Sequence, residues 1–402
     1  METITLSVFD HGEEPMAVLR DVLQQFEAEH GVGVDLEVLP WEGGWGRMMR
    51  QAISEGGIDV SEVGSTWIGD FASSKMDALY TFNRYDIDAM GGEKGFLPAA
   101  WQSGIPASRS RWAPSRVWGV PWLADTRVVF YRRDILERAG IDVTTAFETA
   151  AAFEETVARL QASGVRIPLV LPTLRVRISV HLLACWVWGA GGDFLTPDGR
   201  QVLISAPEAR AGMKAYFSLG RYLPEDVHAI TDHHANELFW QGEAAMTVSG
   251  HWILTQQQGV PEVTANLEAA LPPGVPFVGG LSLVIWGHTR HRKLAGDLVR
   301  FMVHSDTALS LYPLLGPPAR LDRLDQPPFS DDPRYRVLAE ALRTGRSFSS
   351  GHMWGMLESL LADEIPLIWQ DVLTSPESVI EDIIDTHLER VASRFADASG
   401  GV

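Results

Sequence analysis

The sequence predicts an α/β protein of two lobes, in which mostly parallel sheets are flanked by helices. Three observations carry this prediction. The chain has 402 residues, a length that suits two domains better than one. Strand and helix patterns alternate from the N-terminus to about residue 120, as they do in parallel α/β sheets. Linker-like segments near 120–127, 270–277 and 313–330 indicate that the chain crosses between the lobes three times.

These crossings make each lobe discontinuous. The first lobe is predicted to comprise residues 1–122 and 275–316, and the second lobe residues 127–270 and 330–402. Residues that alternate between apolar and polar predict strands, and apolar residues at helical spacing predict helices. In the first lobe these patterns are a strand over Ile4–Val8, a helix over Glu13–His30, a strand over Val34–Val38, a helix over Gly46–Ser54 and a strand over Ile58–Val63.

Loops that follow the strands are the candidate site of the first lobe, because ligands of such sheets bind at the carboxyl ends of the strands. These loops are Asp10–Glu14, Pro40–Trp45 and Gly64–Trp67. Pro98–Ser115, by contrast, is rich in Pro, Ser and Arg without a clear period, and is predicted to be a surface loop.

The segment Trp118–Gly140 is predicted to lead from the first lobe into the second. It begins as an extended Gly-Val-Pro-Trp segment, since the residue before a proline avoids helical geometry. Thr126–Tyr131, dense in β-branched and aromatic residues, predicts a buried strand, and a helix is expected to start at Asp134. Further along, Ser205–Glu208 fits a capping box and Ala244–Val248 a strand.

Composition narrows the possible partners. The formal net charge of −19 argues against nucleic acids and anionic membranes, whose phosphates require clustered Lys and Arg. No apolar run approaches the length of a transmembrane helix. Cys185 is the single cysteine and lies in an apolar run, which predicts an inert core residue. The strand pattern starts directly after Met1, so we expect either a cytoplasmic protein or a mature form without its leader.

Motifs of common enzyme classes are missing from the sequence. It contains no glycine-rich nucleotide loop, no H-E-x-x-H and no G-x-S-x-G. The pairs His233-His234 and His288…His291 lack a matching ligand framework, so neither a metal nor a cofactor is expected. Carboxylates that folding brings together, such as Glu42 with Asp125 or Asp125 with Asp193, leave a glycoside-active enzyme as an alternative.

Tryptophan is the unusual feature of the composition, with 14 residues. Many of them stand beside Gly, Asp, Glu or His in predicted loops. A pyranose ring has apolar faces and a polar rim, which match flat aromatic rings and carboxylate or guanidinium groups. The recurring motifs are Trp41-Glu42-Gly-Gly-Trp45, Ser65-Thr66-Trp67, Trp122…Asp125, Trp188…Gly192-Asp193, Gly250-His251-Trp252 and His352-Met353-Trp354.

Three segments resemble a known family, the extracellular solute-binding proteins, family 1, of ABC importers. The resemblance is to its sugar-binding group, which is similar to maltose-binding protein, and it covers nearly the whole chain. Trp118–Asp142 looks like the first interlobe crossing of that family, Gly242–Trp252 like its G-x-x-A-M-x-x-x-G-x-W segment, and Phe277–Ile285 like its second crossing. Tyr131-Arg132-Arg133 departs from the Tyr-Asn-Lys that the family often has.

The resemblance implies a type II periplasmic-binding-protein-like fold, with a ligand cleft between lobes that close on a carbohydrate. It implies a periplasmic or cell-surface monomer without enzymatic activity or cofactor, which delivers its ligand to an ABC permease. The first lobe would contribute Trp41, Glu42, Ser65, Thr66 and Trp67, and the second Trp188, Gly192, Asp193, Trp252 with its neighbour His251, and Trp354. The crossings would contribute Trp122, Asp125, Arg127, Gly280 and Ser282.

Another small solute, such as a polyamine or a phosphorylated compound, is the alternative within this class. Polyamine sites need several carboxylates without a compensating cation, so Arg127 counts against them. Arg127 is itself expected either at the ligand or in an interlobe salt bridge.

Overall fold

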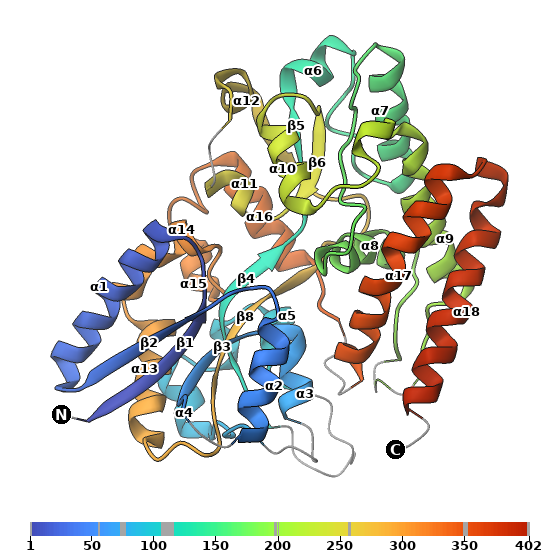
Figure 1. Cartoon of the computed structure of the whole chain (residues 1–402). Coiled ribbons are helices and arrows are strands. Elements are labelled where there is room, and N and C mark those ends of the chain that lie inside the picture. The colour runs from blue at the N-terminus through green and yellow to red at the C-terminus, as the bar shows by residue number, and fades with distance from the viewer. Residues whose placement is uncertain are drawn as a thin grey trace. The chain divides into compact units, whose positions relative to one another are not determined.

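The structure is a computed structural model, which describes residues 2–54, 57–72, 78–105, 116–196, 199, 201–255, 259–348 and 353–399. The chain forms two compact units (Figure 1). The first unit comprises Met1–Asp125, Val278–Asp331 and Ser347–Gly355. The second unit comprises Thr126–Phe277, Asp332–Arg346 and Met356–Val402. Both units are mixtures of strands and helices, as an α/β fold requires.

One segment lies in a different unit from the one that the sequence suggests. Ser347–Gly355 belongs to the first unit, although the sequence suggests the second lobe. Trp354 is therefore a residue of the first unit. The reason is local, because the Trp354 ring stacks on Phe348 at 3.9 Å and Gly355 lies directly against Asp70 of the first unit.

A five-stranded sheet forms the centre of the first unit, with strand order β2-β1-β3-β8-β4. Strand β1 pairs in parallel with β2 and β3, and the three lie side by side in Figure 1. Strand β8 runs antiparallel to β3. The strand bounds are β1 Thr3–Phe9, β2 Gly33–Leu39, β3 Val60–Gly64, β4 Val120–Thr126 and β8 Val278–Ile285.

Helices surround this sheet where the sequence shows helical spacing. The α-helices are α1 Glu13–His30, α2 Gly44–Ser54, α3 Ile68–Phe71, α4 Arg84–Ala89, α5 Pro98–Ser103, α13 Arg292–His304, α14 Tyr312–Leu315 and α15 Leu321–Leu324. Short 3-10 helices are η1 Ser65–Trp67, η2 Glu93–Gly95 and η5 Thr307–Leu311. The bounds of α1 agree with the prediction, and Gly31 ends the helix in left-handed geometry.

Helix α5 corrects the prediction that Pro98–Ser115 is a surface loop. Pro98 occupies the first turn, where its missing N–H costs nothing, and Trp101 is buried and stacks on Phe96. Only six residues form this helix, too few to show a period in the sequence. Residues 106–115 lie outside the described part of the chain.

The crossing near residue 127 is sharper than the sequence suggests. Strand β4 ends at Thr126 and strand β5, Val128–Arg132, begins after a single residue. The chain thus leaves the sheet of one unit and enters the sheet of the other at Arg127. The following helix, α6, starts at Arg133, because Asp134 forms a two-point ion pair with Arg132 instead of capping the helix.

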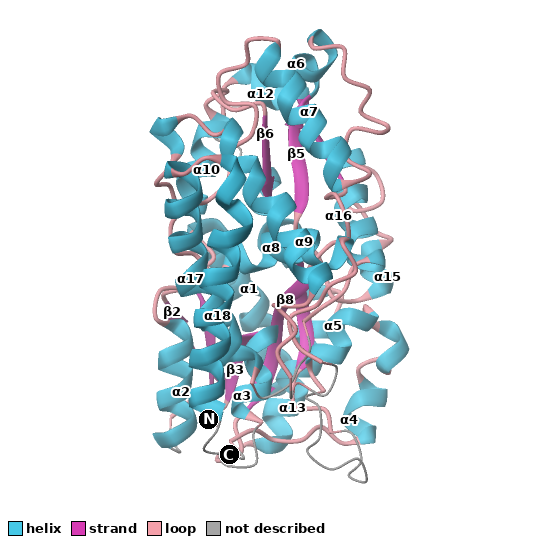
Figure 2. Ribbon diagram, turned by 90° about the vertical axis from the view of Figure 1, so that its right-hand side faces the viewer, coloured by secondary structure: helices cyan, strands magenta, loops and turns pink. Residues whose placement is uncertain are grey.

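The second unit contains a smaller sheet of order β6-β5-β7. Both pairings are antiparallel, and Figure 2 shows β5 and β6 side by side. The predicted predominance of parallel strands is therefore wrong for this unit. Its strands are separated by helices in the sequence, which favours parallel pairing, but β6 and β7 both run opposite to β5, which lies between them. The strands are β5 Val128–Arg132, β6 Met246–Ser249 and β7 Leu267–Ala270.

Helices make up most of the second unit. They are α6 Arg133–Arg138, α7 Ala150–Ala162, α8 Ile178–Gly189, α9 Pro207–Phe217, α10 Asp232–Trp240, α11 Trp252–Thr255, α12 Pro261–Asn266, α16 Pro333–Thr344, α17 Trp354–Thr374 and α18 Ile380–Ser399, with 3-10 helices η3 Ser218–Tyr222, η4 Glu225–Val227 and η6 Glu377–Val379. Helix α9 begins after Ala206 without a side-chain cap, so the predicted capping box at Ser205–Glu208 is wrong.

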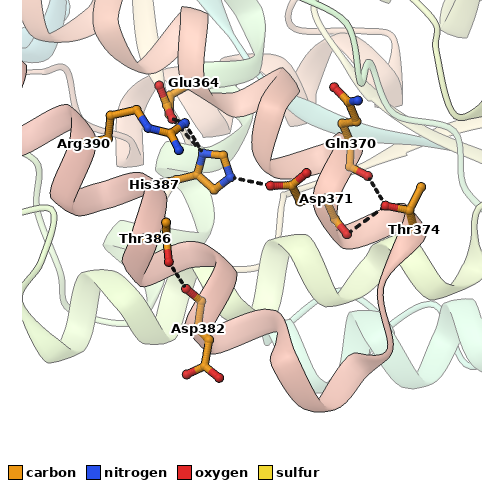
Figure 3. Close-up of polar contacts among 8 residues, drawn as sticks. All are labelled: Glu364, Gln370, Asp371, Thr374, Asp382, Thr386, His387 and Arg390. Atoms are coloured by element: carbon orange, nitrogen blue, oxygen red, sulfur yellow. Dashed lines mark hydrogen bonds and ion pairs between the residues drawn. The ribbon is translucent and has the colours of Figure 1, made fainter.

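A buried polar cluster joins α17 to α18 (Figure 3). The His387 ring lies between two carboxylates, with Nδ1 2.7 Å from Glu364 and Nε2 3.0 Å from Asp371. Arg390 donates to the same Glu364 oxygen at 2.5 Å. The cluster thus links helices α17 and α18 through polar side chains.

We expect Glu364→Ala to lower the free energy of unfolding by about 3 kcal/mol, because it leaves His387 and Arg390 without their shared buried acceptor. Denaturant unfolding measures this loss. Glu389→Ala removes an exposed carboxylate from α18 and should change stability by less than about 0.5 kcal/mol. Equal effects of the two substitutions would contradict the structural role of the cluster.

Gly280 and Gly296 provide a second matched test. Gly280 has φ of +134°, and a Cβ there would lie 2.1 Å from the Leu123 carbonyl oxygen. Gly280→Ala should therefore cost about 3 kcal/mol of unfolding free energy. A Cβ at Gly296 in α13 meets nothing within 4 Å, so Gly296→Ala should stabilise the protein by about 0.5–1 kcal/mol. Thermal or denaturant unfolding compares the pair.

Candidate functional site

Trp41 is an exposed aromatic ring at the carboxyl end of the first-unit sheet. Its indole is 48% exposed, yet three contacts hold it in place. The ring stacks on Phe9 at 4.4 Å, its Nε1 donates to the Asp10 carbonyl oxygen at 2.7 Å, and the His11 ring meets it edge-on at 5.5 Å. The three partners are consecutive: Phe9 is the last residue of β1, and Asp10 and His11 follow it. Trp41 is thus a fixed flat surface, which suits a stacking role.

Beneath Trp41 lies a buried ion pair. Nε2 of His11 is 2.9 Å and 3.2 Å from the two carboxylate oxygens of Glu62, which is fully buried on β3. Burial alone would lower the pKa of His11, but the charge and hydrogen bond of Glu62, together with the charge of Asp10, raise the pKa above its ordinary value. The charged imidazolium is therefore more favoured in His11 than in an ordinary histidine side chain.

The other residues predicted near this edge are placed differently. Glu42 is exposed, Thr66 is half-buried, and Ser65 and Trp67 are buried. The Trp67 ring packs edge-on against Phe9 within the hydrophobic core of the unit. Trp67 is therefore a core residue, as many tryptophans of globular proteins are.

Asp70 of the first unit contacts Trp45 and the start of α17. Nε1 of Trp45 donates to an Asp70 carboxylate oxygen at 3.1 Å. The start of α17 touches the same carboxylate, since a Cβ on Gly355 would fall 2.2 Å from it. Trp354 is buried against Phe348. Its motif partner His352 lies outside the described residues.

The predicted residues of the crossings lie in strands β4 and β8. Trp122 is buried and Asp125 is half-buried at the end of β4. Ser282 is buried in β8 opposite Val63 of β3. Gly280 allows the backbone of β8 to approach Leu123 and Ala124 closely. A side chain at position 280 would clash with these residues, which explains why glycine stands there.

In the second unit, Trp252 and Arg127 form the main aromatic contact. Trp252 is half-buried at the start of α11. The guanidinium of Arg127 lies over the Trp252 ring at 4.9 Å and over the Phe277 ring at 5.4 Å. Arg127 is only 1% exposed, so this cation is held between two aromatic faces inside one unit. Such a desolvated cation–π contact is worth about 2 kcal/mol.

A chain of polar contacts continues from Arg127 to helix α17. Arg127 Nη2 donates to Nδ1 of His181 at 3.0 Å, and His181 Nε2 faces Glu358 at 3.4 Å. Arg177 donates to the other oxygen of Glu358 at 2.7 Å. The His181 ring also stacks on Phe277 at 4.1 Å. Glu358 is buried, and the guanidinium of Arg177 balances its charge, as burial of a carboxylate requires.

Gly250 permits the position of Trp252. A Cβ at Gly250 would lie 2.2 Å from the Trp252 ring, so any larger residue would displace the indole. His251, half-buried, meets the same ring edge-on at 5.6 Å. The Gly250-His251-Trp252 motif thus places one indole against the backbone after β6.

Trp188, Gly192 and Asp193 form a separate cluster in the second unit. Trp188 donates to Asp193 at 3.1 Å, and Arg346 contacts both, donating to Asp193 at 2.6 Å and lying over the indole at 4.8 Å. A Cβ at Gly192 would lie 2.5 Å from the backbone nitrogen of Ala209. The glycine is therefore explained by the close approach of α9.

Sequence reasoning missed His11, Glu62, His181, Glu358 and Phe277 as members of the two aromatic sites. A buried carboxylate within a strand pattern, as at Glu62, is the one signal that marks such a residue, since a lone buried charge requires a partner. The partner itself is not visible, because His11 lies 51 residues away in sequence.

Two surface cavities lie away from these aromatic residues. One of about 360 Å³ lies beside α2 and is lined in part by Glu37, Arg47 and Arg50. Another of about 610 Å³ lies between α9 and α18, where Arg210 pairs with Asp385 and Lys214 with Glu381. Across the described ranges, no group of three or more His, Cys, Asp or Glu residues is arranged to hold a metal ion.

Two further observations concern the class of protein. None of the helices within the described part of the chain has the length and hydropathy needed to cross a bilayer. Cys185 is fully buried, and burial raises the pKa of its thiol to about 12. The thiolate that a nucleophile requires is therefore disfavoured.

We expect Arg127→Lys to lower the free energy of unfolding by about 1–2 kcal/mol, because an ammonium cannot stack flat between Trp252 and Phe277. Arg133→Lys is the matched control, since Arg133 is 48% exposed and forms only surface ion pairs. Its effect should stay below about 0.5 kcal/mol. Denaturant unfolding midpoints of the two variants measure this difference. A loss in Arg127→Lys alone indicates that Arg127 stabilises the protein by stacking, and equal small effects indicate that only its charge matters.

Several known proteins are similar to this chain in sequence or in fold. The chain is 24% identical over 320 residues to the diacetylchitobiose binding protein DasA of Streptomyces coelicolor, covering 74% of this chain and 68% of the relative. A solute-binding protein of an ABC transporter from Thermotoga lettingae, bound with α-D-tagatose, has a TM-score of 0.79 at 17% identity, covering 98% of this chain and 100% of that chain. Maltose-bound MalE3 of T. maritima also has a TM-score of 0.79, at 21% identity, covering 97% and 100%.

The sequence profile of the bacterial extracellular solute-binding proteins matches residues 10–308. This match includes Asp10, His11 and Trp41, the crossing at Arg127 and the Gly250-His251-Trp252 turn. Because it spans more than half of the chain, the protein belongs to the bacterial extracellular solute-binding proteins.

Proposed function

We propose that the protein is the substrate-binding component of an ABC importer, which captures a carbohydrate by closure of its two units and delivers it to the permease. One observation carries the proposal. Each unit holds a tryptophan whose ring is partly open to solvent but fixed by contacts on its other sides: Trp41 in the first unit and Trp252 in the second.

Fixed aromatic rings suit a sugar for two reasons. The apolar face of a pyranose stacks on an indole, and a ring that is already immobile loses little entropy when the ligand binds. Polar groups near each ring, such as His11 and Asp10 beside Trp41, match the hydroxyl rim.

The relatives support a carbohydrate as the ligand class. DasA binds diacetylchitobiose by its name, and the T. lettingae and T. maritima proteins were crystallised with tagatose and maltose. These ligands are neutral polyhydroxylated molecules of different sizes.

A cationic ligand is the weaker alternative because of Arg127. Its guanidinium already lies over one face of Trp252, and a second cation on the opposite face would meet its charge across the thickness of one ring. A polyamine would experience this repulsion, whereas a neutral sugar would not. The buried position of Arg127 also removes it from direct contact with solvent-borne ligands, so we no longer assign it to the ligand itself.

Closure follows from differential contact. A ligand that touches both units only in the closed form shifts the equilibrium towards that form by the extra binding free energy it gains there. The permease would then recognise the closed state. The protein would act outside the cytoplasmic membrane, as its extracellular family does.

A glycoside-active enzyme is the alternative from another class. Asp193, a candidate carboxylate for such chemistry, contacts Trp188 and Arg346 through its two oxygens. Turnover of a chromogenic glycoside would establish the enzyme and overturn the binding role.

A thermal-shift screen tests the ligand class. The panel contains maltose, diacetylchitobiose and tagatose, with putrescine and glucose 6-phosphate as competitors from other classes. A ligand at a hundredfold excess over its Kd stabilises the native state by about 2.7 kcal/mol. A rise in melting temperature with at least one sugar supports the proposal. A rise with putrescine or the phosphate ester alone contradicts it.

Substitution of the two rings tests the site. Trp41→Ala and Trp252→Ala should each weaken sugar binding about tenfold, or about 1.4 kcal/mol, because each removes one stacking surface. Tyr85→Ala is the control, since Tyr85 is 87% exposed on α4 and outside the proposed site. Titration calorimetry measures all three. Unchanged affinity in both tryptophan variants would remove these rings from the site.

A further inference from the structure

The surroundings of Trp41 are unusually ordered for an exposed ring. Among the described residues, it is the only tryptophan in the exposed class of large hydrophobic side chains. It is nevertheless held by Phe9, Asp10 and His11, three successive residues at the end of β1. Two of these contacts are insensitive to pH: the stacked phenyl ring and the backbone carbonyl. The third, the edge of His11, belongs to a titratable group.

The His11 ring is in turn oriented by Glu62. Both oxygens of Glu62 lie within 3.2 Å of its Nε2. This carboxylate is fully buried in β3, so it cannot leave the ring for solvent without exposing the strand. The imidazole is thus fixed between a rigid anion and the indole that it meets at an interplanar angle of 86°.

We propose that His11 and Glu62 position Trp41 as the ligand-stacking surface of the first unit, so that the orientation of this ring depends on the protonation of His11. The inference rests on the proposed function and assigns to it two positioning residues. Neither needs to touch the ligand.

The acidic groups around His11 determine in which direction pH changes the hold on Trp41. The groups that face His11 are Glu62 from β3 and Asp10 from its own loop, both acidic. Burial opposes the charged imidazolium, but these carboxylates prevail and raise the pKa of His11 above 6.5. A raised pKa in the folded state means that the interaction is complete below pH 6.5 and is lost as the pH rises through the folded-state value.

Loss of the proton has a structural consequence. A neutral imidazole still donates to Glu62 through one nitrogen, but it loses the charge that attracts the carboxylate. The neutral side chain is then held less firmly in its position against Trp41. We therefore expect the exposed ring to become less fixed, and a stacked sugar to bind less tightly, at alkaline pH.

The test follows the Trp41 indole N–H by two-dimensional ¹H–¹⁵N NMR from pH 5.5 to 9, without ligand. Trp41→Phe identifies the resonance. In the wild type, the Trp41 signal should move with the same midpoint as the ring protons of His11. In Glu62→Gln, which keeps the shape of the side chain, the midpoint should fall to lower pH. In His11→Asn the Trp41 signal should not titrate.

His291→Asn is the matched control. His291 also pairs with a glutamate of the first unit, Glu2, at 2.7 Å, but it lies away from Trp41. The Trp41 titration should be unchanged in this variant. A Trp41 signal that is independent of pH while His11 titrates, or that titrates equally in His11→Asn, would overturn the proposal. If His11→Asn does not fold, the comparison of wild type with Glu62→Gln still decides.

Calorimetry with maltose adds a second readout. If maltose binds, its affinity should fall as the pH rises through the His11 midpoint in the wild type and stay flat in His11→Asn. Absence of maltose binding at every pH would count against the proposed ligand, whereas the NMR titration would still report on the positioning role. The two failures are therefore distinguishable.

Discussion

The contact on which most of the structure depends is the burial of Arg127 between Trp252 and Phe277. Arg127 is the single residue between β4 and β5, the strands of two different sheets. A cation at that point needs both aromatic faces and a buried acceptor, and His181 with Glu358 supplies the latter. The same contact covers one face of Trp252, a residue of the proposed site. One side chain thus links the path of the chain to the properties of the proposed site.

Much of the fold could be predicted because it is encoded by local patterns. Helix α1 has the predicted bounds, and the strands β1, β2 and β3 lie where residues alternate. The first crossing was found from the density of β-branched and aromatic residues around Val128–Tyr131. Strand direction in the second unit was not predictable, because antiparallel pairing of β5 with β6 and β7 depends on connections of more than a hundred residues. Helix α5 was too short to have a period.

The site was predictable in its chemistry and less so in its membership. Trp41 and Trp252 stand out as tryptophans beside Gly and His, and both rings are partly open to solvent. Trp67, Trp188 and Trp354 have the same kind of neighbours in sequence but are buried, since a motif does not reveal which side of a loop faces the core. The partners that hold the two open rings, His11 with Glu62 and Arg127 with His181, come together only through folding.

A crystal structure of the protein with a bound sugar tests the central claim most directly. The sugar would be the member of the panel that raises the melting temperature most. The account predicts that its ring faces lie on the open sides of Trp41 and Trp252, with Arg127 still covering the other face of Trp252. A sugar bound elsewhere, with both indoles free of ligand, would contradict it.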